Sequence, residues 1–217
     1  MDDKNLDTQR KSKPEERWMG EYGESWTKDF ENRDVEEAEK WFKKHFGRSK
    51  RDLLERFLDP VDKDARILEV GANVGAQLSF LSEMGFTNLY GIDIQEHAVH
   101  QSRPELNVIQ GNMFDIPFKD GYFDLVFTHG TLIHSPPDKI DIAVNEISRC
   151  SNRWIFGHEY YADSYVEIKH RGEENVLWKT DFPSKFSEKQ GSKIVDIEYL
   201  EYNDNDNVDV EYLIKLD

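Results

Sequence analysis

Short apolar runs alternate with amphipathic segments from residue 66 onward. These runs end near glycine or an acidic residue, and we expect them to form strands at 66–70, 88–92, 107–110, 123–127 and 154–157. Segments of helical character separate most of the runs, and the clearest of them covers residues 77–84. Strands that alternate with helices are typical of a parallel sheet. The pattern therefore predicts an α/β fold with a mostly parallel sheet.

The two ends of the chain carry other patterns. β-rich runs at 194–202 and 208–215 flank an Asn/Asp loop, which predicts a C-terminal antiparallel hairpin. Residues 1–16 offer little to bury, so we expect a disordered tail. Aromatic residues recur at a spacing of four from Trp18 to Phe30, as in a helical stripe, and a further helix is expected at 50–58.

One domain fits this organisation. Its expected extent is 17–217, with a helical cap at 17–60 and a sheet core at 61–217. The 44 acidic and 28 basic side chains give a net charge of −16, so no nucleic-acid partner is expected. No stretch approaches the roughly 20 apolar residues of a membrane span, and Cys150 is the single cysteine, which fits a cytoplasmic protein without membrane contact.

Metal and nucleic-acid motifs are incomplete in this sequence. His97 and His100 have a helical spacing, yet no further ligands stand near them, and the acidic loop at 203–207 lacks the glycine and glutamate of a calcium hand. The segment 135–138 places Asp138 where nucleic-acid amino-methyltransferases carry a base-stacking aromatic residue. We therefore expect no metal site and no action on nucleic acid.

The strongest chemical signal is the segment 67–75, a strand that runs into a glycine turn and a helix. Such a turn lets backbone approach a ligand and aims helix N–H groups at it. An ordinary strand–turn–helix is the alternative, and a nicotinamide site would carry the spacing G-x-G-x-x-G, which is missing. The pattern resembles motif I of class I S-adenosylmethionine-dependent methyltransferases, with Asn73 in place of the middle glycine.

Later strand ends extend this resemblance. Asp93 closes the second strand, where a carboxylate can accept hydrogen bonds from ribose hydroxyls. The resemblance implies that S-adenosylmethionine is the cofactor and that adenine lies against the polar and apolar pair after the third strand. The cofactor-binding residues that it implies are Glu69, Gly71, Asn73, Gly75, Asp93, Ile94, Asn112, Met113 and Thr128. The implied fold is the Rossmann-like sheet of this class.

Segments outside this core are similar to the pseudaminic acid biosynthesis-associated methylases. The similar segments span residues 15 to 202 and include 18–23, 127–134, 149–155, 159–161, 166–168, 171–172 and 178–182. This family resemblance implies a nonulosonic acid or an amino-sugar intermediate as the methyl acceptor.

Acid–base candidates follow the fourth and fifth strands. His134, Glu159 and His129 could accept a proton from a hydroxyl or ammonium acceptor, although a catalytic base is optional in methyl transfer. The alternative for the histidines is packing. The candidates for substrate binding are Trp18, Tyr22, Tyr160, Tyr161 and Arg171, which could instead cap the sheet edge or lie on the surface.

These observations predict methyl transfer to an oxygen or nitrogen of a small polar molecule. Two alternatives remain open: a cofactor-binding pathway partner without catalysis, and a methyltransferase that acts on another small molecule or on a protein. Intact Glu69, Gly71, Gly75 and Asp93 favour cofactor binding in either case. The pattern leaves the oligomeric state undetermined.

Overall fold

Apolar runs form the centre of one sheet. The computed structural model describes residues 11–31 and 34–217, which form a 7-stranded sheet in the order β3-β2-β1-β4-β5-β9-β8. Its strands are β1 (Arg66–Val70), β2 (Asn88–Asp93), β3 (Asn107–Gln110), β4 (Phe123–His129), β5 (Ser151–Tyr160), β8 (Ser192–Glu201) and β9 (Val208–Leu216). The expected α/β fold with a C-terminal antiparallel hairpin is confirmed.

The strands β1 to β5 are parallel, whereas β9 runs antiparallel to both β5 and β8. The second strand of the hairpin therefore lies beside the parallel block, and β8 forms the outer edge. In the pairing of β5 with β9, His158 stands opposite Glu211 and Tyr160 stands opposite Asp209. This register brings charged residues that are far apart in the sequence to the same place on the sheet.

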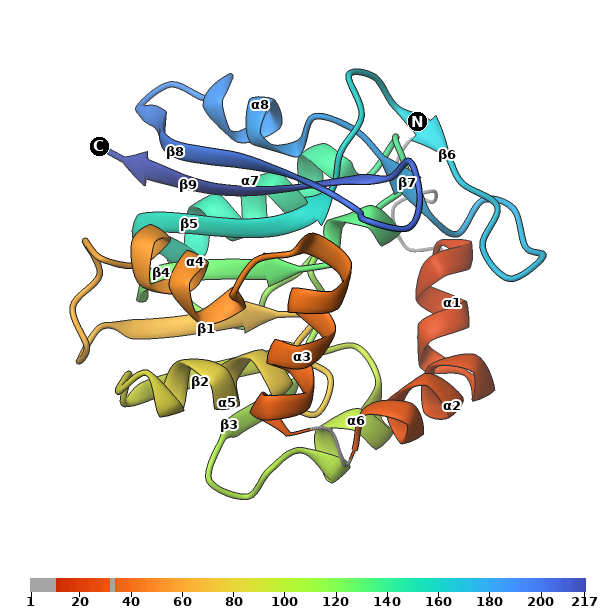
Figure 1. The fold of residues 1–217 in the computed structure, drawn as a ribbon, viewed down its shortest axis with the longest axis horizontal. Coiled ribbons are helices and arrows are strands. Elements are labelled where there is room, and N and C mark those ends of the chain that lie inside the picture. The colour runs from red at the N-terminus through yellow and green to blue at the C-terminus, as the bar shows by residue number, and fades with distance from the viewer. Residues whose placement is uncertain (1–10, 32–33) are drawn as a thin grey trace, which may run out of the picture.

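Helices cover both faces of the sheet because neighbouring strand residues point to opposite sides. In β1, Ile67 joins the core formed with α3 (Val35–Phe46), α4 (Lys50–Phe57) and α5 (Ala76–Glu83). Leu68 joins the core of the other face. That second core includes α7 (Ile140–Cys150) and α8 (Phe182–Ser187), while α6 (Glu96–Gln101) connects β2 to β3 (Figure 1).

Two short helices, α1 (Lys13–Met19) and α2 (Glu21–Phe30), lie at the end of the sheet toward which β1 and β4 point (Figure 1). Gly20 separates them, so the expected aromatic stripe is divided between two helices. Helix α1 begins inside the segment for which the sequence predicted no structure, because buried Glu15 bonds to residues of the sheet domain. Residues 1–10 of that segment lie outside the described residues.

A second sheet was not foreseen from the sequence. Strands β6 (Val166–Glu167) and β7 (Trp178–Lys179) pair antiparallel after β5. The loop between them contacts α1, where Arg17 Nε lies 3.3 Å from a Glu173 carboxylate oxygen and Lys13 Nζ donates to the Glu174 carbonyl over 2.6 Å. Together, α1 and this loop cover the carboxyl end of the parallel strands. None of the described helices is long and apolar enough to cross a membrane.

Candidate functional site

A cavity of about 840 Å³ lies at the carboxyl edge of the parallel strands. Its wall comes from the tips of β1, β2, β4 and β5, from the loop after β3, and from α1 to α4. The loop between β6 and β7 and the hairpin complete it. Carboxyl ends of parallel strands are the usual place for ligands in open α/β sheets. Most of the residues singled out in the sequence line this one cavity.

The turn after β1 has the backbone that its glycines require. Gly71 and Gly75 adopt φ values of 80° and 82°, and Asn73 adopts 48°. Asparagine tolerates this left-handed conformation better than most residues, which explains how it can replace the middle glycine. The Asn73 side chain also accepts a hydrogen bond from Thr27 Oγ1 of α2 over 3.2 Å. The departure from the glycine pattern thus connects the turn to the N-terminal cap.

Asp93 holds that turn from the tip of β2. Its Oδ2 accepts the Asn73 backbone N–H over 2.7 Å, and its Oδ1 accepts the Gln95 backbone N–H over 2.9 Å. Burial raises the pKa of the Asp93 carboxyl, against these N–H donors. Asp93 and Ile94 both line the cavity. The carboxylate therefore orders the first turn as well as facing the space where a ligand would lie.

Glu69, near the tip of β1, and Lys50 are both buried, and their charges influence each other. Burial raises the pKa of Glu69 well above its ordinary value, against the attraction of Lys50. Burial also lowers the pKa of Lys50 to about 8. Both residues line the cavity, and Glu69 Oε2 has no hydrogen-bond partner among the described residues. The sequence analysis missed Lys50, because it stands at the start of a helix with no recognisable motif around it.

The loop after β3 closes the far end of the cavity with Asn112 and Met113. Asn112 Nδ2 donates to Glu15 Oε1 over 2.8 Å, and Lys139 Nζ donates to Glu15 Oε2 over 2.7 Å. Glu15 was placed in the tail by the sequence, and yet it is buried against the residue pair predicted to hold adenine. The cap thus contacts this part of the cavity directly.

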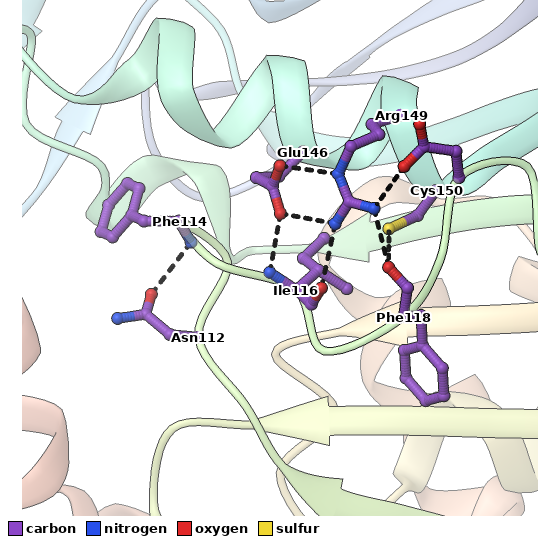
Figure 2. A network of polar contacts seen from close by, with 8 residues as sticks. Asn112, Phe114, Ile116, Phe118, Glu146, Arg149 and Cys150 are labelled. Atoms are coloured by element: carbon purple, nitrogen blue, oxygen red, sulfur yellow. Dashed lines mark hydrogen bonds and ion pairs between the residues drawn. The ribbon is translucent and has the colours of Figure 1, made fainter.

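Arg149 of α7 fixes the same loop from behind (Figure 2). Its guanidinium donates to the carbonyls of Ile116 and Phe118 over 3.0 and 2.7 Å, and it pairs with Glu146. Glu146 in turn accepts the Ile116 backbone N–H over 2.8 Å. Charge-assisted hydrogen bonds of this kind hold a loop in one geometry. The position of the predicted adenine pair thus depends on α7.

Two predicted cofactor residues stand outside the wall. Gly75 is the N-cap of α5, and a Cβ at this position would lie 2.4 Å from Leu106 Cδ1, so that the leucine side chain would have to shift. Thr128 is buried in β4 beneath the cavity. The remaining predicted cofactor residues line the cavity: Glu69, Gly71, Asn73, Asp93, Ile94, Asn112 and Met113.

The three acid–base candidates, His134, Glu159 and His129, all line the cavity. His134 Nδ1 donates to the Val176 carbonyl over 2.9 Å, which leaves Nε2 as an acceptor, and burial lowers its pKa to about 4. Burial also holds the pKa of His129 well below its ordinary value. Both imidazoles are therefore neutral near pH 7 and are weak bases.

The Glu159 carboxylate accepts hydrogen bonds from backbone N–H groups. Its Oε1 accepts the N–H groups of Thr131 and Leu132, each over 3.2 Å, and its Oε2 accepts the Ile133 N–H over 3.3 Å. Burial raises the pKa of Glu159 to about 7, against these three donors. The turn that it binds is the 3-10 helix η3 (Leu132–His134). Glu159 therefore organises the segment that carries His134.

The proposed substrate-binding residues divide into two groups. Trp18, Tyr160 and Arg171 line the cavity, and the Trp18 ring meets the His134 ring edge-on at a centroid distance of 4.8 Å. Tyr22 and Tyr161 do not line it. The Tyr22 hydroxyl lies 2.9 Å from His170 Nε2, and the Tyr161 hydroxyl donates to Asp163 outside the cavity.

A charged network on β5 and β9 was missed in the sequence. His158 Nδ1 lies 2.9 Å from Glu211 Oε1, and its Nε2 lies 2.9 Å from Asp209 Oδ2. Burial disfavours the charged ring, but these two carboxylates outweigh it and raise the pKa of His158 to about 9. The His129 ring stacks on that of His158 at a centroid distance of 4.3 Å. A usable signal was the alternation of acids with valines at 208–211, which puts both acids on one face.

Known proteins resemble this chain in sequence. Residues 68–153 match the family described as "Methyltransferase domain". The 24-methylenesterol C-methyltransferase 2 of Arabidopsis thaliana is 27% identical over 122 residues, which cover 48% of this chain and 33% of that protein. The match thus spans about a third of the length of this curated relative.

Solved structures resemble the chain over more of its length. The magnesium protoporphyrin IX methyltransferase of Synechocystis PCC 6803, solved with bound SAH, has a TM-score of 0.68 at 13% identity. That match covers 94% of this chain and 98% of the other. The cyclase SpnF has a TM-score of 0.62 at 12% identity, over 76% and 79% of the two chains.

The fold is that of the Rossmann-like class I methyltransferases. Residues 68–153 thus resemble a methyltransferase domain in sequence, and the chain around them has the fold of this class.

Proposed function

We propose that the protein transfers a methyl group from S-adenosylmethionine to an oxygen or nitrogen of a small polar molecule. The observation that carries this proposal is the single cavity of about 840 Å³ that joins the turn after β1, Asp93 and the Asn112 loop to the tips of β4 and β5. Cavities that hold small ligands have volumes of roughly 300–1,000 Å³. This one is large enough for a nucleotide-like cofactor with a small acceptor beside it.

The residues suit such a cofactor in two ways. Asp93 offers a carboxylate at the position where ribose hydroxyls bind in sheets of this kind, and Glu69 Oε2 is buried without a partner among the described residues. When bound, S-adenosylmethionine would supply an electrophilic methyl group. The chain would contribute alignment of the acceptor and exclusion of water, and alignment alone can lower a barrier by roughly 7–11 kcal/mol. His134, Glu159 and His129 stay our candidates for proton acceptance where the acceptor must lose a proton.

The acceptor that we propose is a nonulosonic acid or an amino-sugar intermediate. Its support is the resemblance of residues 15 to 202 to the pseudaminic acid biosynthesis-associated methylases. We further propose that the protein acts in the cytoplasm, without nucleic-acid or membrane partners, in keeping with its net charge of −16.

A cofactor-binding protein without methyl transfer is the second candidate. The similarity of this fold to the cyclase SpnF favours keeping it, since the fold serves proteins of different activities. Action on another small molecule or on a protein is the remaining alternative. Incubation with cofactor labelled in the methyl group and a fractionated metabolite extract separates these candidates, because only a transferase moves label into an acceptor.

Calorimetry in the presence of a chelator tests the cofactor. We expect S-adenosylmethionine and S-adenosylhomocysteine to bind without any metal, since the cavity wall offers backbone amides and carboxylates for them. Titration with a nicotinamide dinucleotide is the control and should give no heat of binding. Binding that disappears with the chelator, or a preference for the dinucleotide, would contradict the proposed cofactor.

Asp93→Ala should weaken cofactor binding by about 1.5–3 kcal/mol, the range for lost hydrogen bonds to a charged group. The substitution removes the carboxylate that we propose binds the ribose hydroxyls. It also leaves the Asn73 N–H without its acceptor. Calorimetry gives the affinity, and thermal unfolding checks that the variant is folded. Asp93→Asn is the matched variant, since it keeps the side-chain size and one acceptor oxygen. An unchanged affinity in both variants would mean that the ribose is bound elsewhere.

A further inference from the structure

The pairing of β5 with β9 places a carboxylate, Asp209, in the part of the cavity that lies beyond β4 and β5, where we expect the methyl acceptor to bind. Asp209 is 2% exposed and lines the cavity wall. Its Oδ2 lies 2.9 Å from His158 Nε2 and accepts the Tyr202 hydroxyl over 3.1 Å. These two partners fix the side chain. In sheet order, Asp209 lies beyond β4 and β5, on the side away from the Asp93 ribose position.

The second oxygen of this carboxylate is unused. Asp209 Oδ1 is buried and has no hydrogen-bond partner among the described residues. A buried acceptor without a donor costs free energy that a ligand donor can recover. Glu211 differs in one respect: it also holds His158 and has an unpaired oxygen, but it does not line the cavity. Asp209 Oδ1 is therefore the atom that we expect to accept a hydrogen bond from a donor group on a ligand.

The cavity wall as a whole favours positive charge that develops on a ligand. Acidic side chains outnumber basic ones in the cavity wall, where the Lys and Arg residues are Lys40, Lys50 and Arg171. The wall also carries aromatic rings, which attract cations through their faces. The aromatic residues concerned are Trp18, Trp26, Trp41, Phe42, Tyr160 and Tyr202. His158 already balances part of the charge of Asp209 and Glu211. Lys50 also interacts with the charge of Glu211.

The candidate bases named above are at least partly buried, and two of them already make hydrogen bonds with the backbone. Glu159 is engaged by three backbone N–H groups, and His134 donates through Nδ1 while its Nε2 lies in a buried ring. A hydroxyl nucleophile must lose its proton as it is methylated, which calls for a base. A neutral amine needs none, since its nitrogen can keep its hydrogens and carry the positive charge. Asp209 itself already pairs with His158 and accepts the Tyr202 hydroxyl, so it serves as a hydrogen-bond acceptor more readily than as a base. The arrangement therefore suits nitrogen better than oxygen.

We propose that the methyl acceptor is a primary or secondary amine whose N–H group binds Asp209 Oδ1. This inference rests on the proposed function and narrows it to N-methylation. Of the two substrate classes proposed above, it selects the amino sugar and disfavours an acid whose carboxylate would meet the acidic wall.

The reaction balances without a base. The amine binds in its free-base form, after losing a proton to water. Its nitrogen lone pair forms the N–C bond while the C–S bond breaks, and the electron pair of that bond remains on sulfur. Positive charge passes from the sulfonium to the nitrogen, and the N-methylammonium product loses a proton to water after release. Asp209 pairs with the charge that develops on nitrogen, so it stabilises the transition state more than the bound free base.

Selective acetylation tests the acceptor class with the wild-type protein. A metabolite extract is divided, and one half is treated with acetic anhydride in aqueous bicarbonate, which blocks primary and secondary amines. Both halves are then incubated with the protein and methyl-labelled S-adenosylmethionine. We expect label transfer in the untreated half alone, into a product that a cation exchanger retains at low pH. Transfer that survives acetylation would overturn the inference and leave the proposed function intact.

A matched pair of variants tests the role of Asp209. Asp209→Asn should reduce kcat/KM for the acceptor by about 10- to 100-fold, the equivalent of one hydrogen bond to a charged group. Affinity for S-adenosylhomocysteine should change by less than about threefold, since the ribose and adenine positions lie elsewhere. Glu211→Gln removes the same charge from the same histidine but does not touch the cavity, so its effect should be much smaller.

The outcomes separate the two proposals. Equal losses in Asp209→Asn and Glu211→Gln would assign both carboxylates to His158 and would overturn the binding role. If calorimetry shows cofactor binding but no label passes from the cofactor into any compound of the untreated extract, methyl transfer itself is refuted, and the inference with it. Should Asp209→Asn fail to fold, the acetylation experiment on the wild-type protein still decides the acceptor class.

Discussion

Gly71→Ala should weaken cofactor binding by about 10- to 100-fold and lower the free energy of unfolding by roughly 2–6 kcal/mol. Gly71 has a φ of 80°, which strains any residue with a Cβ atom. A Cβ at this position would also lie 2.3 Å from Thr131 Oγ1 and 2.6 Å from Thr131 Cγ2. Either the turn after β1 or the Thr131 segment must move, and both line the cavity.

The controls separate strain from steric conflict. Gly121→Ala introduces a Cβ at a φ of 58° with nothing within 4 Å of it, so it should show backbone strain alone and normal cofactor affinity. The double variant Gly71→Ala/Thr131→Gly removes the conflicting side chain, and it should recover part of the lost affinity. With the wild type and the single variant Thr131→Gly added, calorimetry and thermal unfolding on Gly71→Ala and the double variant complete a double-mutant cycle. Wild-type affinity in Gly71→Ala would mean that this turn does not contact the cofactor.

The parallel part of the fold could be predicted because its signals are local. Strands β1 and β3 have the bounds that their apolar runs indicated, and β2 and β4 extend the predicted runs at their ends. Strand β5 begins earlier and ends later than the run at 154–157, since pairing with β9 continues to Tyr160. Long-range pairing supplies that extension, and the local pattern carries no trace of it.

The cofactor side of the cavity could be predicted for the same reason. Glu69, Gly71, Asn73 and Asp93 lie in short motifs at strand ends, and the sheet brings such ends to one edge. The cap was harder to predict because α1, which lies at the end of the sheet in Figure 1, is held there by hydrogen bonds to segments far along the chain. Residues 13–16 have few apolar side chains, so their helix depends on tertiary partners that the local pattern does not reveal.

The acceptor side depends on register. His158 meets Asp209 and Glu211 because β9 pairs with β5 in one particular alignment, and a shift by one residue would turn both acids to the other face. Whether an aromatic candidate lines the cavity also depends on its place relative to β5. Tyr160 belongs to β5 and lines the cavity, whereas Tyr161 follows the strand and bonds outside it.

Glu159→Gln should reduce turnover and stability while cofactor affinity stays within about threefold of wild type. Its carboxylate accepts three backbone N–H groups from the turn at 131–133. Glutamine keeps one acceptor oxygen, and its NH2 group would face at least one of those donors. Loss of a hydrogen bond to a charged group, with a donor left unpaired, should lower the free energy of unfolding by about 1–3 kcal/mol.

The kinetic loss should come through position. The turn held by Glu159 leads into His134, whose ring packs on Trp18 of the cap. A displacement of about 1 Å at a reacting group can cost roughly 100-fold in rate, so we expect kcat to fall by about 10- to 100-fold. Glu159→Ala is the comparison variant. Alanine removes both carboxylate oxygens and adds no NH2 group. The turn at 131–133 then meets no opposing donor, but its three N–H groups lose their acceptor.

The pH dependence distinguishes this positioning role from proton transfer. Burial raises the pKa of Glu159 from 4.5 to about 7, so the folded state binds a proton more readily than the unfolded state between these values. Relative to Glu159→Gln, the wild-type free energy of unfolding should therefore fall as pH rises from 4.5 to 7. Measurement of unfolding across this range checks the sign, and a difference that does not vary with pH would contradict the shifted pKa.

Kinetics across the same range complete the test. A positioning residue leaves the shape of the pH profile of kcat/KM unchanged in the variant. A general base would instead give a wild-type rate that rises through pH 7, a limb absent from Glu159→Gln, and a loss of about 10²- to 10⁴-fold. That result would return proton transfer to Glu159 and, because a base would then be present, would weaken the case for an amine. Loss of cofactor binding in Glu159→Gln would contradict both roles and move the search for the acceptor position to His129 and His134.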